Sequence, residues 1–154
     1  MEKKAHTDKN LVLVNCHTHK VVYLSPTQPG KKHAKKQADE AAIVYPPQAT
    51  LGQDTGFQGY QPTGVMVWQP KKKPRGQALT VADKYLNGLL SSARIVVEHT
   101  LAGVKRCPIV KAVFRNTKAG LTDTVMEIAC ALHNLRVHSR HPLPTFNLFA
   151  SYSK

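Results

Sequence analysis

The chain has 154 residues, with 22 lysines and arginines against 9 aspartates and glutamates, which gives a formal net charge of +13. This length suits one domain with its own core, and the charge predicts a polyanionic partner. Apolar runs such as Leu11–Val14 are far shorter than the ~20 residues of a membrane-spanning helix, so no membrane association is expected. Three cysteines without a C-x-x-C pair argue against a disulfide framework or a zinc knuckle and favour a cytoplasmic protein.

The first half of the chain alternates strand and helix patterns. Apolar runs at Leu11–Asn15 and Val21–Leu24 flank a short polar segment, which predicts a hairpin whose strands are buried on both faces. Helix formers fill Lys31–Val44 without internal proline or glycine, which predicts a basic helix. Ala49–Leu51 and Val65–Trp68 are two further short strand candidates beside glycine-containing turns.

The second half of the chain is predicted to be mostly helical. Pro70–Gly76 is a basic linker, after which the Thr80 hydroxyl can cap a helix while Asp83 reaches back. That helix is expected to run over Val81–Arg106, with its end marked by a glycine and a proline. A last amphipathic helix is predicted over Thr122–Arg136. Its apolar face would consist of Val125, Ile128, Leu132 and Leu135.

Charged side chains form a stripe along the long helix. Arg94, Glu98 and Lys105 are four and then seven residues apart, which places them within about 40° of one another. An apolar stripe runs beside them and consists of Leu86, Leu90, Val97, Leu101 and Val104. Glu98 is therefore expected to be half-buried between two cations, to stay ionised and to be able to bind a divalent metal. The alternative is an exposed Arg94–Glu98 ion pair worth about 0.3–0.5 kcal/mol.

A second candidate acid is Asp54. It lies where a short apolar strand gives way to Gly56 and Gly59, which is a common place for a site residue in an α/β domain. The alternative is an Asx-turn residue that only turns the chain. Asp54 and Glu98 can meet only if the long helix packs across the sheet near the end of that strand.

The aromatic residues suit the core better than a base-stacking site, and the histidines suit loop and tail positions better than a zinc site. Trp68 and Tyr60 each lie beside an apolar strand, so both are expected in the core. Two close histidine pairs lack a matching second pair at the spacing of zinc ligands. These pairs are His17 with His19 and His138 with His141.

The segment Leu51–Tyr60 around Asp54, together with the spacing Arg94-x3-Glu98-x6-Lys105, resembles the DDE-type transposases of bacterial insertion sequences and the related Harbinger-like endonucleases. Further segments similar to this group are His6–Asn10, Leu24–Gly30, Pro70–Pro74 and Ala131–Arg136. The resemblance implies an α/β fold over residues 1–137, with an RNase H-like mixed β-sheet that is flanked by helices and lacks its first strand. Residues 138–154 would then form an irregular C-terminal tail.

The resemblance also implies a function, which is DNA transposition by metal-dependent phosphodiester cleavage and strand transfer. Asp54 and Glu98 would be catalytic and would ligate Mg²⁺ or Mn²⁺, since paired metals can drive an in-line displacement at phosphorus. Arg94 and Lys105 would hold phosphates of the transposon ends. A flexible basic arm would add salt-sensitive contacts to the same DNA through Lys71, Lys72, Lys73 and Arg75. The protein would then associate with the nucleoid in the cytoplasm.

The chain departs from the family pattern in its acids. The first acid of the DDE triad lies on a strand before the hairpin, where only Glu2 and Asp8 stand and neither fits the motif. Activity would therefore need an upstream transposase fragment, supplied by frameshifting or as a partner chain. Ser91 occupies the tyrosine position of the helical motif, and Ala34 stands where the family often has aspartate.

Two alternatives remain open. Charge and size alone favour a non-catalytic basic nucleic-acid-binding protein, whose binding would depend on salt but not on Mg²⁺ or Asp54. The other alternative is a fragment that does not fold stably without its central strand.

Overall fold

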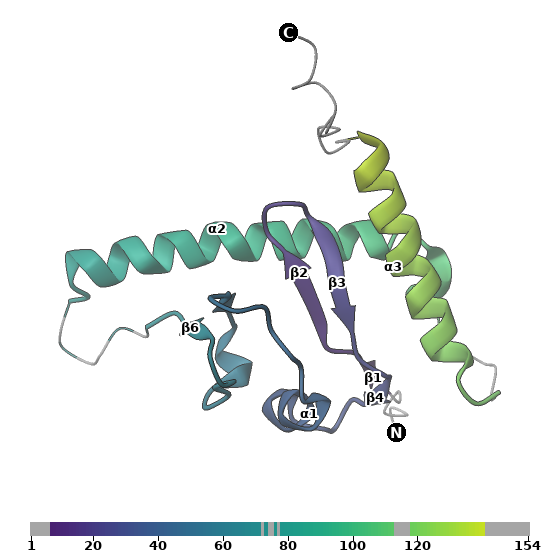
Figure 1. The fold of residues 1–154 in the computed structure, drawn as a ribbon, viewed down its shortest axis with the longest axis horizontal. Coiled ribbons are helices and arrows are strands. Elements are labelled where there is room, and N and C mark those ends of the chain that lie inside the picture. Colours follow the sequence, from purple (N-terminus) through teal and green to yellow (C-terminus); the bar gives the residue numbers. More distant parts are fainter. Residues whose placement is uncertain (1–6, 72, 74–75, 77, 113–117, 141–154) are drawn as a thin grey trace, which may run out of the picture.

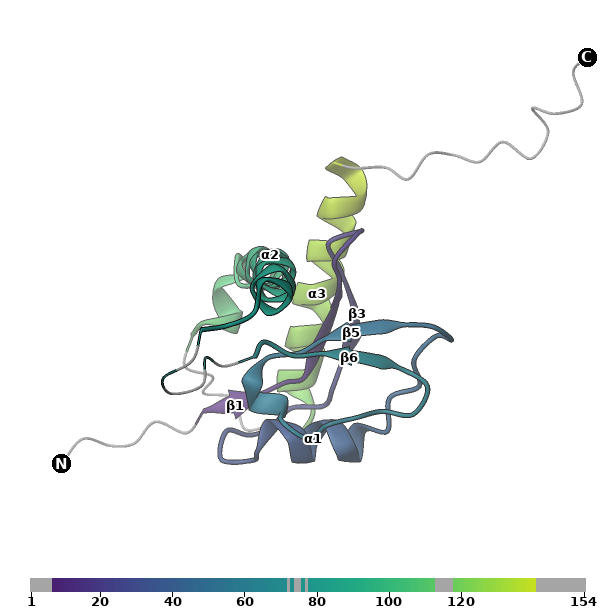
Figure 2. The ribbon, with the colours of Figure 1, turned by 90° about the vertical axis from the view of Figure 1, so that its left-hand side faces the viewer.

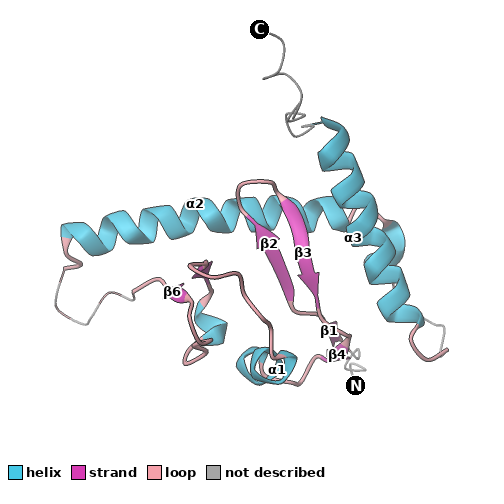
Figure 3. Ribbon diagram, in the orientation of Figure 1, coloured by secondary structure: helices cyan, strands magenta, loops and turns pink. Residues whose placement is uncertain are grey.

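The fold combines short strands with helices. The computed structural model describes residues 7–71, 73, 76, 78–112 and 118–140 (Figures 1 and 3). The strands are β1 Asp8–Lys9, β2 Val12–Asn15, β3 Lys20–Leu24, β4 Gln28–Pro29, β5 Thr50–Gly52 and β6 Met66–Trp68. The helices are α1 Ala34–Ala41, α2 Val81–Val104 and α3 Leu121–Arg140, with short 3-10 turns η1 at Thr55–Phe57 and η2 at Pro108–Val110. The mixed α/β class is thereby confirmed.

The strands pair in twos. β2 pairs with β3 and β1 with β4 in antiparallel fashion, whereas β5 and β6 are parallel. Both directions expected of a mixed sheet therefore occur, but the described strands form three separate pairs rather than one continuous sheet. The reason is that the part of the chain that the structure describes contains no strand that joins the β2–β3 hairpin to the β5–β6 pair.

The β2–β3 hairpin is confirmed, and an asparagine shapes its turn. The Asn15 Oδ1 atom accepts hydrogen bonds from the backbone N–H groups of His17 and Thr18, both at 2.9 Å. His19 has a left-handed backbone with φ of 57°, and its N–H donates to the Asn15 carbonyl at 2.8 Å. The expectation that both faces of the strands are buried is wrong, because Val22 on β3 is 62% exposed while Val21 is buried.

Two apolar clusters form the core. One joins β3, α2 and α3 through Val21, Val104, Ala129 and Cys130. The other lies between the start of β2, α1 and the turn after η1, and its buried members are Leu11, Ala38 and Tyr60. Figure 2, which looks along α2, shows α3 beside β3, and α1 below the β5–β6 pair. Tyr60 is thus a core residue as expected, and Trp68 is half-buried.

The two long helices match their predicted faces to different degrees. On α2 the predicted apolar stripe is packed, with Leu90, Val97 and Leu101 half-buried and Val104 buried, and only Leu86 is exposed. On α3 Val125 is half-buried, but the other three residues of the predicted apolar face, Ile128, Leu132 and Leu135, are exposed by 55%, 50% and 61%. The packed face of α3 instead carries Ala129, Cys130 and His133. Ala129 and Cys130 are small enough to allow close approach to β3 and α2, which favours this face.

The ends of two helices also differ from the prediction. α3 continues to Arg140, four residues beyond the predicted end, so the tail proposed for residues 138–154 begins inside this helix. Residues 141–154 lie outside the described part of the chain. α1 begins at Ala34 rather than Lys31 and ends where Ala42 adopts a left-handed backbone with φ of 43°. No helix within the described ranges is long and apolar enough to cross a membrane.

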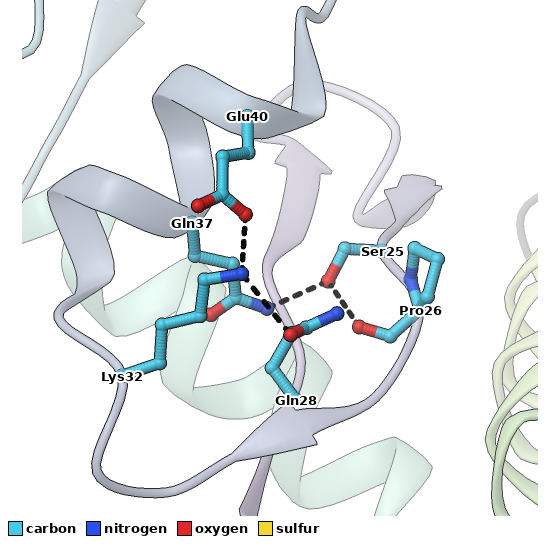
Figure 4. A network of polar contacts seen from close by, with 6 residues as sticks. All are labelled: Ser25, Pro26, Gln28, Lys32, Gln37 and Glu40. Atoms are coloured by element: carbon cyan, nitrogen blue, oxygen red, sulfur yellow. Dashed lines mark hydrogen bonds and ion pairs between the residues drawn. The ribbon is translucent and has the colours of Figure 1, made fainter.

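A polar network fastens α1 to the end of β3 (Figure 4). The buried Ser25 hydroxyl donates to the Pro26 carbonyl at 3.0 Å and accepts from Gln37 Nε2 at 2.9 Å. It also accepts from the Leu11 N–H at 2.8 Å. The Lys32 ammonium bridges Gln28 on β4 and Glu40 on α1. The Leu24–Gly30 segment therefore has a structural role, because it sets the position of α1 against the hairpin.

Candidate functional site

Asp54 follows the end of a short strand, as predicted, and this strand, β5, pairs in parallel with β6. The β5–β6 pairing extends one step beyond the strand, where the Gln53 N–H donates to the Trp68 carbonyl at 3.0 Å. Asp54 comes next and caps η1, and its exposed carboxylate accepts from the Thr55 N–H at 2.8 Å. The position suits a site residue at the carboxyl end of a strand. The bond to Thr55 also fits the alternative of a turn residue.

Two buried amide groups lie beside Asp54 at this edge of the strand pair. Gln53 follows β5 and Gln69 follows β6, so both stand at the carboxyl ends of the parallel strands. The Gln53 Oε1 and Gln69 Nε2 atoms are buried and have no hydrogen-bond partner within the described residues. A buried polar atom without a partner costs about 1–3 kcal/mol. The edge next to Asp54 therefore contains one buried acceptor and one buried donor that lack partners among the described residues.

Glu98 lies on α2 and is exposed. Its Oε1 atom is 3.2 Å from Nε of Arg94, and the two side chains are 62% and 66% exposed. Lys105 caps the C-terminus of α2 and is also exposed. The prediction of a half-buried Glu98 between two cations is therefore wrong, since α2 buries residues such as Thr100 and Val104 on another face. An exposed pair of this kind contributes about 0.3–0.5 kcal/mol.

The two candidate acids lie on neighbouring elements. The end of β5 approaches α2, because a Cβ atom built on Gly52 would lie 3.5 Å from Cδ2 of Leu90. Leu90 precedes Glu98 by two helical turns, about 12 Å along the axis. Each carboxylate is hydrogen-bonded within its own element, Asp54 to Thr55 and Glu98 to Arg94. The strand end and the helix thus meet as required, while the hydrogen bonds of each acid stay local.

Carboxylate oxygens are suitable ligands for Mg²⁺ or Mn²⁺, so the donor type of Asp54 and Glu98 fits a divalent metal. The number of ligands that the structure brings together does not fit a divalent metal site. Within residues 7–71, 73, 76, 78–112 and 118–140, no group of three or more His, Cys, Asp or Glu side chains could hold a metal ion. His141, a member of the second histidine pair, lies outside the described residues.

The basic linker begins at the same edge as Asp54 and is attached to α2. The Lys71 ammonium lies 2.7 Å from the Asp83 carboxylate. The Asn87 side chain accepts from the Lys71 N–H and donates to the Lys71 carbonyl, both at 3.0 Å. Lys71 is therefore held in place, and the prediction of a flexible arm is wrong for this residue. Lys73 is exposed, and the predicted DNA contacts Lys72 and Arg75 lie outside the described residues.

Asp83 anchors this linker and the start of α2 together. Hydrogen bonds from Lys71 and Thr80 lower the pKa of its carboxyl group. The Thr80 hydroxyl in turn accepts from the Asp83 N–H at 3.1 Å, which confirms the predicted cap. The Asp83 carboxylate thus stays ionised and keeps the Lys71 ammonium at this end of α2.

A comparison with known families decides the affiliation. The profile of the DDE superfamily endonucleases matches residues 1–134, which include Asp54, Glu98 and the elements from β1 through most of α3. The chain belongs to the DDE superfamily endonucleases. Transposase-type nuclease function, DNA as the substrate and the general use of divalent metals are properties of this family. Comparisons with curated proteins and with solved structures gave no significant match.

Sequence reasoning missed a buried polar junction in this DDE superfamily endonuclease. The His133 ring lies 5% exposed between α2, α3 and the β2–β3 turn. Its Nδ1 atom is 3.0 Å from Nη2 of Arg136, and its Nε2 atom is 3.0 Å from the His19 carbonyl. Because a guanidinium only donates, Nδ1 accepts and the ring proton is on Nε2, which donates to His19. The Arg136 Nη2 group also donates to the Gly103 carbonyl at 3.0 Å.

The signal for this junction was present in the sequence. His133 and Arg136 belong to the Ala131–Arg136 segment that resembles the family, and Gly103 lies near the end of the long helix. Gly103 marks the end of the long helix in the sequence, and α2 does end one residue later, at Val104. A Cβ atom at Gly103 would overlap the His133 ring and would lie 2.9 Å from Arg136 Nη2. This glycine therefore serves the close approach of α2 and α3.

Proposed function

We propose that the chain is the catalytic portion of a DDE-type transposase of a bacterial insertion sequence, in the Harbinger-like group. The main observation behind this proposal is that the end of β5 lies close to α2. Asp54 follows β5, and Glu98 lies on α2. Both acids lie within the segment that matches the family. The reaction would be cleavage and strand transfer at the phosphodiester bonds of transposon ends, with the protein bound to the nucleoid.

In this proposal Asp54 and Glu98 would hold Mg²⁺ or Mn²⁺, which would stabilise the charge that develops on a phosphodiester during its displacement. Arg94 would hold the exposed Glu98 carboxylate toward solvent, where DNA can reach it. Lys105 would contact a phosphate. The linker would contact further phosphates through Lys71, Lys72, Lys73 and Arg75. The position of Lys71 at the Asp54 edge of the strand pair, held by Asn87, supports a contact near the cleaved bond.

The remaining carboxylate would come from an upstream transposase fragment. That fragment would also supply a strand between the β2–β3 hairpin and the β5–β6 pair and so complete an RNase H-like sheet over residues 1–137. The separate strand pairs, and the Gln53 Oε1 and Gln69 Nε2 atoms that lack partners among the described residues, support this arrangement. On its own the chain would bind DNA and a divalent metal weakly, without cleavage.

Metal binding tests the assignment of the two acids. We expect Mn²⁺ titrations, followed by electron paramagnetic resonance, to show weak binding that Glu98→Gln and Asp54→Asn each remove. Glu40→Gln is the matched control, because Glu40 is also a helical glutamate in an ion pair. Metal affinity that is equal in Glu98→Gln and Glu40→Gln would refute the role of Glu98.

A non-catalytic nucleic-acid-binding protein is the second candidate. The exposed Arg94–Glu98 pair and the turn-forming bond of Asp54 favour it, since both acids then need no further role. In that case DNA affinity would fall with salt and would be the same with and without Mg²⁺. Asp54→Asn would leave this affinity unchanged, and addition of an upstream fragment would give no cleavage of transposon-end DNA.

A further inference from the structure

A cavity of about 360 Å³ lies between the C-terminal part of α2, the C-terminal half of α3 and the β2–β3 turn. Its lining is basic apart from small and apolar residues, and the basic members are His19, His99, Arg106, His133, Arg136 and Arg140. The volume lies at the lower end of the range of about 300–1,000 Å³ that is typical of small-ligand sites. We refer to it as the basic cavity.

Among the described residues, the arginines of the basic cavity have no acidic partner. The ion pairs in the part of the chain that the structure describes use the cations Lys32, Lys35, Lys71 and Arg94. Arg136 bonds to a carbonyl and to a neutral ring nitrogen, neither of which carries a formal negative charge. Guanidinium groups remain charged at every physiological pH, so their mutual repulsion at one cavity is unfavourable. A bound anion would remove this repulsion.

Arg136 is held in advance in a position to receive an anion. Its Nη2 protons are used by Gly103 and His133, which leaves the protons of Nε and Nη1 for a ligand. The absence of a side chain at Gly103 is what allows this approach. A guanidinium fixed in this way loses little conformational entropy on binding, and its planar donors match phosphate oxygens.

The basic cavity is separate from the stripe of Arg94, Glu98 and Lys105. His99 follows Glu98 directly and so lies about 100° around α2 from it. The two surfaces are therefore adjacent on one helix, close enough for one extended polyanion to contact both.

We propose that the basic cavity binds a phosphate group of a nucleic acid backbone. The inference rests on the proposed function only for the source of the phosphate. The cavity chemistry alone would equally accept a free phosphate, and the net charge of +13 favours the polyanionic backbone.

The test is DNA binding by the full chain in EDTA, so that loss of a metal site cannot affect the result. Arg106→Gln with Arg140→Gln removes two exposed charges from the cavity and leaves the Arg136 junction intact. Lys36→Gln with Lys84→Gln is the matched control, because it removes two exposed charges elsewhere. Thermal melts of both double variants verify that they are folded.

We expect the cavity variant to lose about tenfold in duplex affinity relative to the control. Its slope of log affinity against log salt should shrink by about 1, since each phosphate contact contributes about 0.9. Equal affinity and slope in the two variants would overturn the assignment to a nucleic acid backbone.

A second arm titrates inorganic phosphate and follows the NMR signals of His99 and His133. Shifts that saturate in the control but not in the cavity variant would confirm the anion site. Saturating shifts combined with unchanged DNA binding would show that the ligand is a free phosphate and would overturn the nucleic acid source. The absence of shifts together with unchanged DNA binding would overturn the site itself.

Discussion

Gly103→Ala should destabilise the protein, although alanine is the better helix former. The new methyl group would overlap the His133 ring and would lie 2.9 Å from Arg136 Nη2. The ring is 5% exposed and hydrogen-bonded at both nitrogens, so it has little freedom to move away. α2 and α3 would have to separate, or the polar junction would have to break.

The expected magnitude follows from three contributions. Overpacking of a buried site costs about 1–3 kcal/mol. Weakening of the Arg136–Gly103 and Arg136–His133 hydrogen bonds adds about 1–2 kcal/mol. The greater helix propensity of alanine offsets about 1 kcal/mol of this loss in stability. The net loss is about 1–4 kcal/mol, which corresponds to a decrease in Tm of roughly 2–15 °C for a domain of this size.

Gly88→Ala is the matched control, because it makes the same exchange in the same helix. Outside its own stretch of helix, a Cβ atom at Gly88 would have no neighbour within 4 Å, so only the higher helix propensity of alanine affects stability. We expect Gly88→Ala to stabilise the protein by about 0.5–1 kcal/mol. Urea unfolding of the two variants, followed by circular dichroism, measures both effects. A stabilising Gly103→Ala would refute the close approach of α2 and α3.

Three further predictions concern other parts of the fold. The Thr27 hydrogen bonds lower the pKa of Asp123, so its contribution to stability is present above about pH 4 and is lost as the pH falls through the folded-state pKa. In urea unfolding, Asp123→Asn should therefore be less stable than the wild type at pH 7, and equal stabilities there would contradict this. Burial raises the pKa of the Cys130 thiol, so iodoacetamide should modify the exposed Cys16 first and Cys130 only in denaturant, as mass spectrometry can show. Asn87→Ala should increase tryptic cleavage after Lys71 several-fold with little change in Tm, and unchanged cleavage would contradict the attachment of the linker.

Local signals in the sequence predicted most elements. The hairpin, both short parallel strands and the long helix occur within a few residues of their expected positions, and Thr80 caps α2 as expected. These features depend on neighbouring residues, such as a hydroxyl before a helix or a left-handed turn between two apolar runs. Pairing between distant strands depends on which elements meet in space. The single mixed sheet was therefore the part of the fold that local patterns could not establish.

Burial was predicted less well than secondary structure, and α3 shows why. The hydropathy pattern favours the face with Ile128, Leu132 and Leu135, yet the helix packs through Ala129, Cys130 and His133. Small side chains contribute little to a hydropathy pattern, although they permit the closest contact. A hydropathy pattern treats His133 as polar and therefore exposed. Its burial depends on hydrogen bonds at both ring nitrogens, one of which is made to His19, far away in the sequence.

The same reasoning separates the two charged surfaces of α2. The spacing of Arg94, Glu98 and Lys105 forms a sequence motif, and these side chains are exposed. The basic cavity has no such motif, because its residues come from several elements. Arg136 is positioned by a glycine on α2 and by a histidine that itself bonds to the β2–β3 turn. The turn, α2 and α3 therefore fix one guanidinium together.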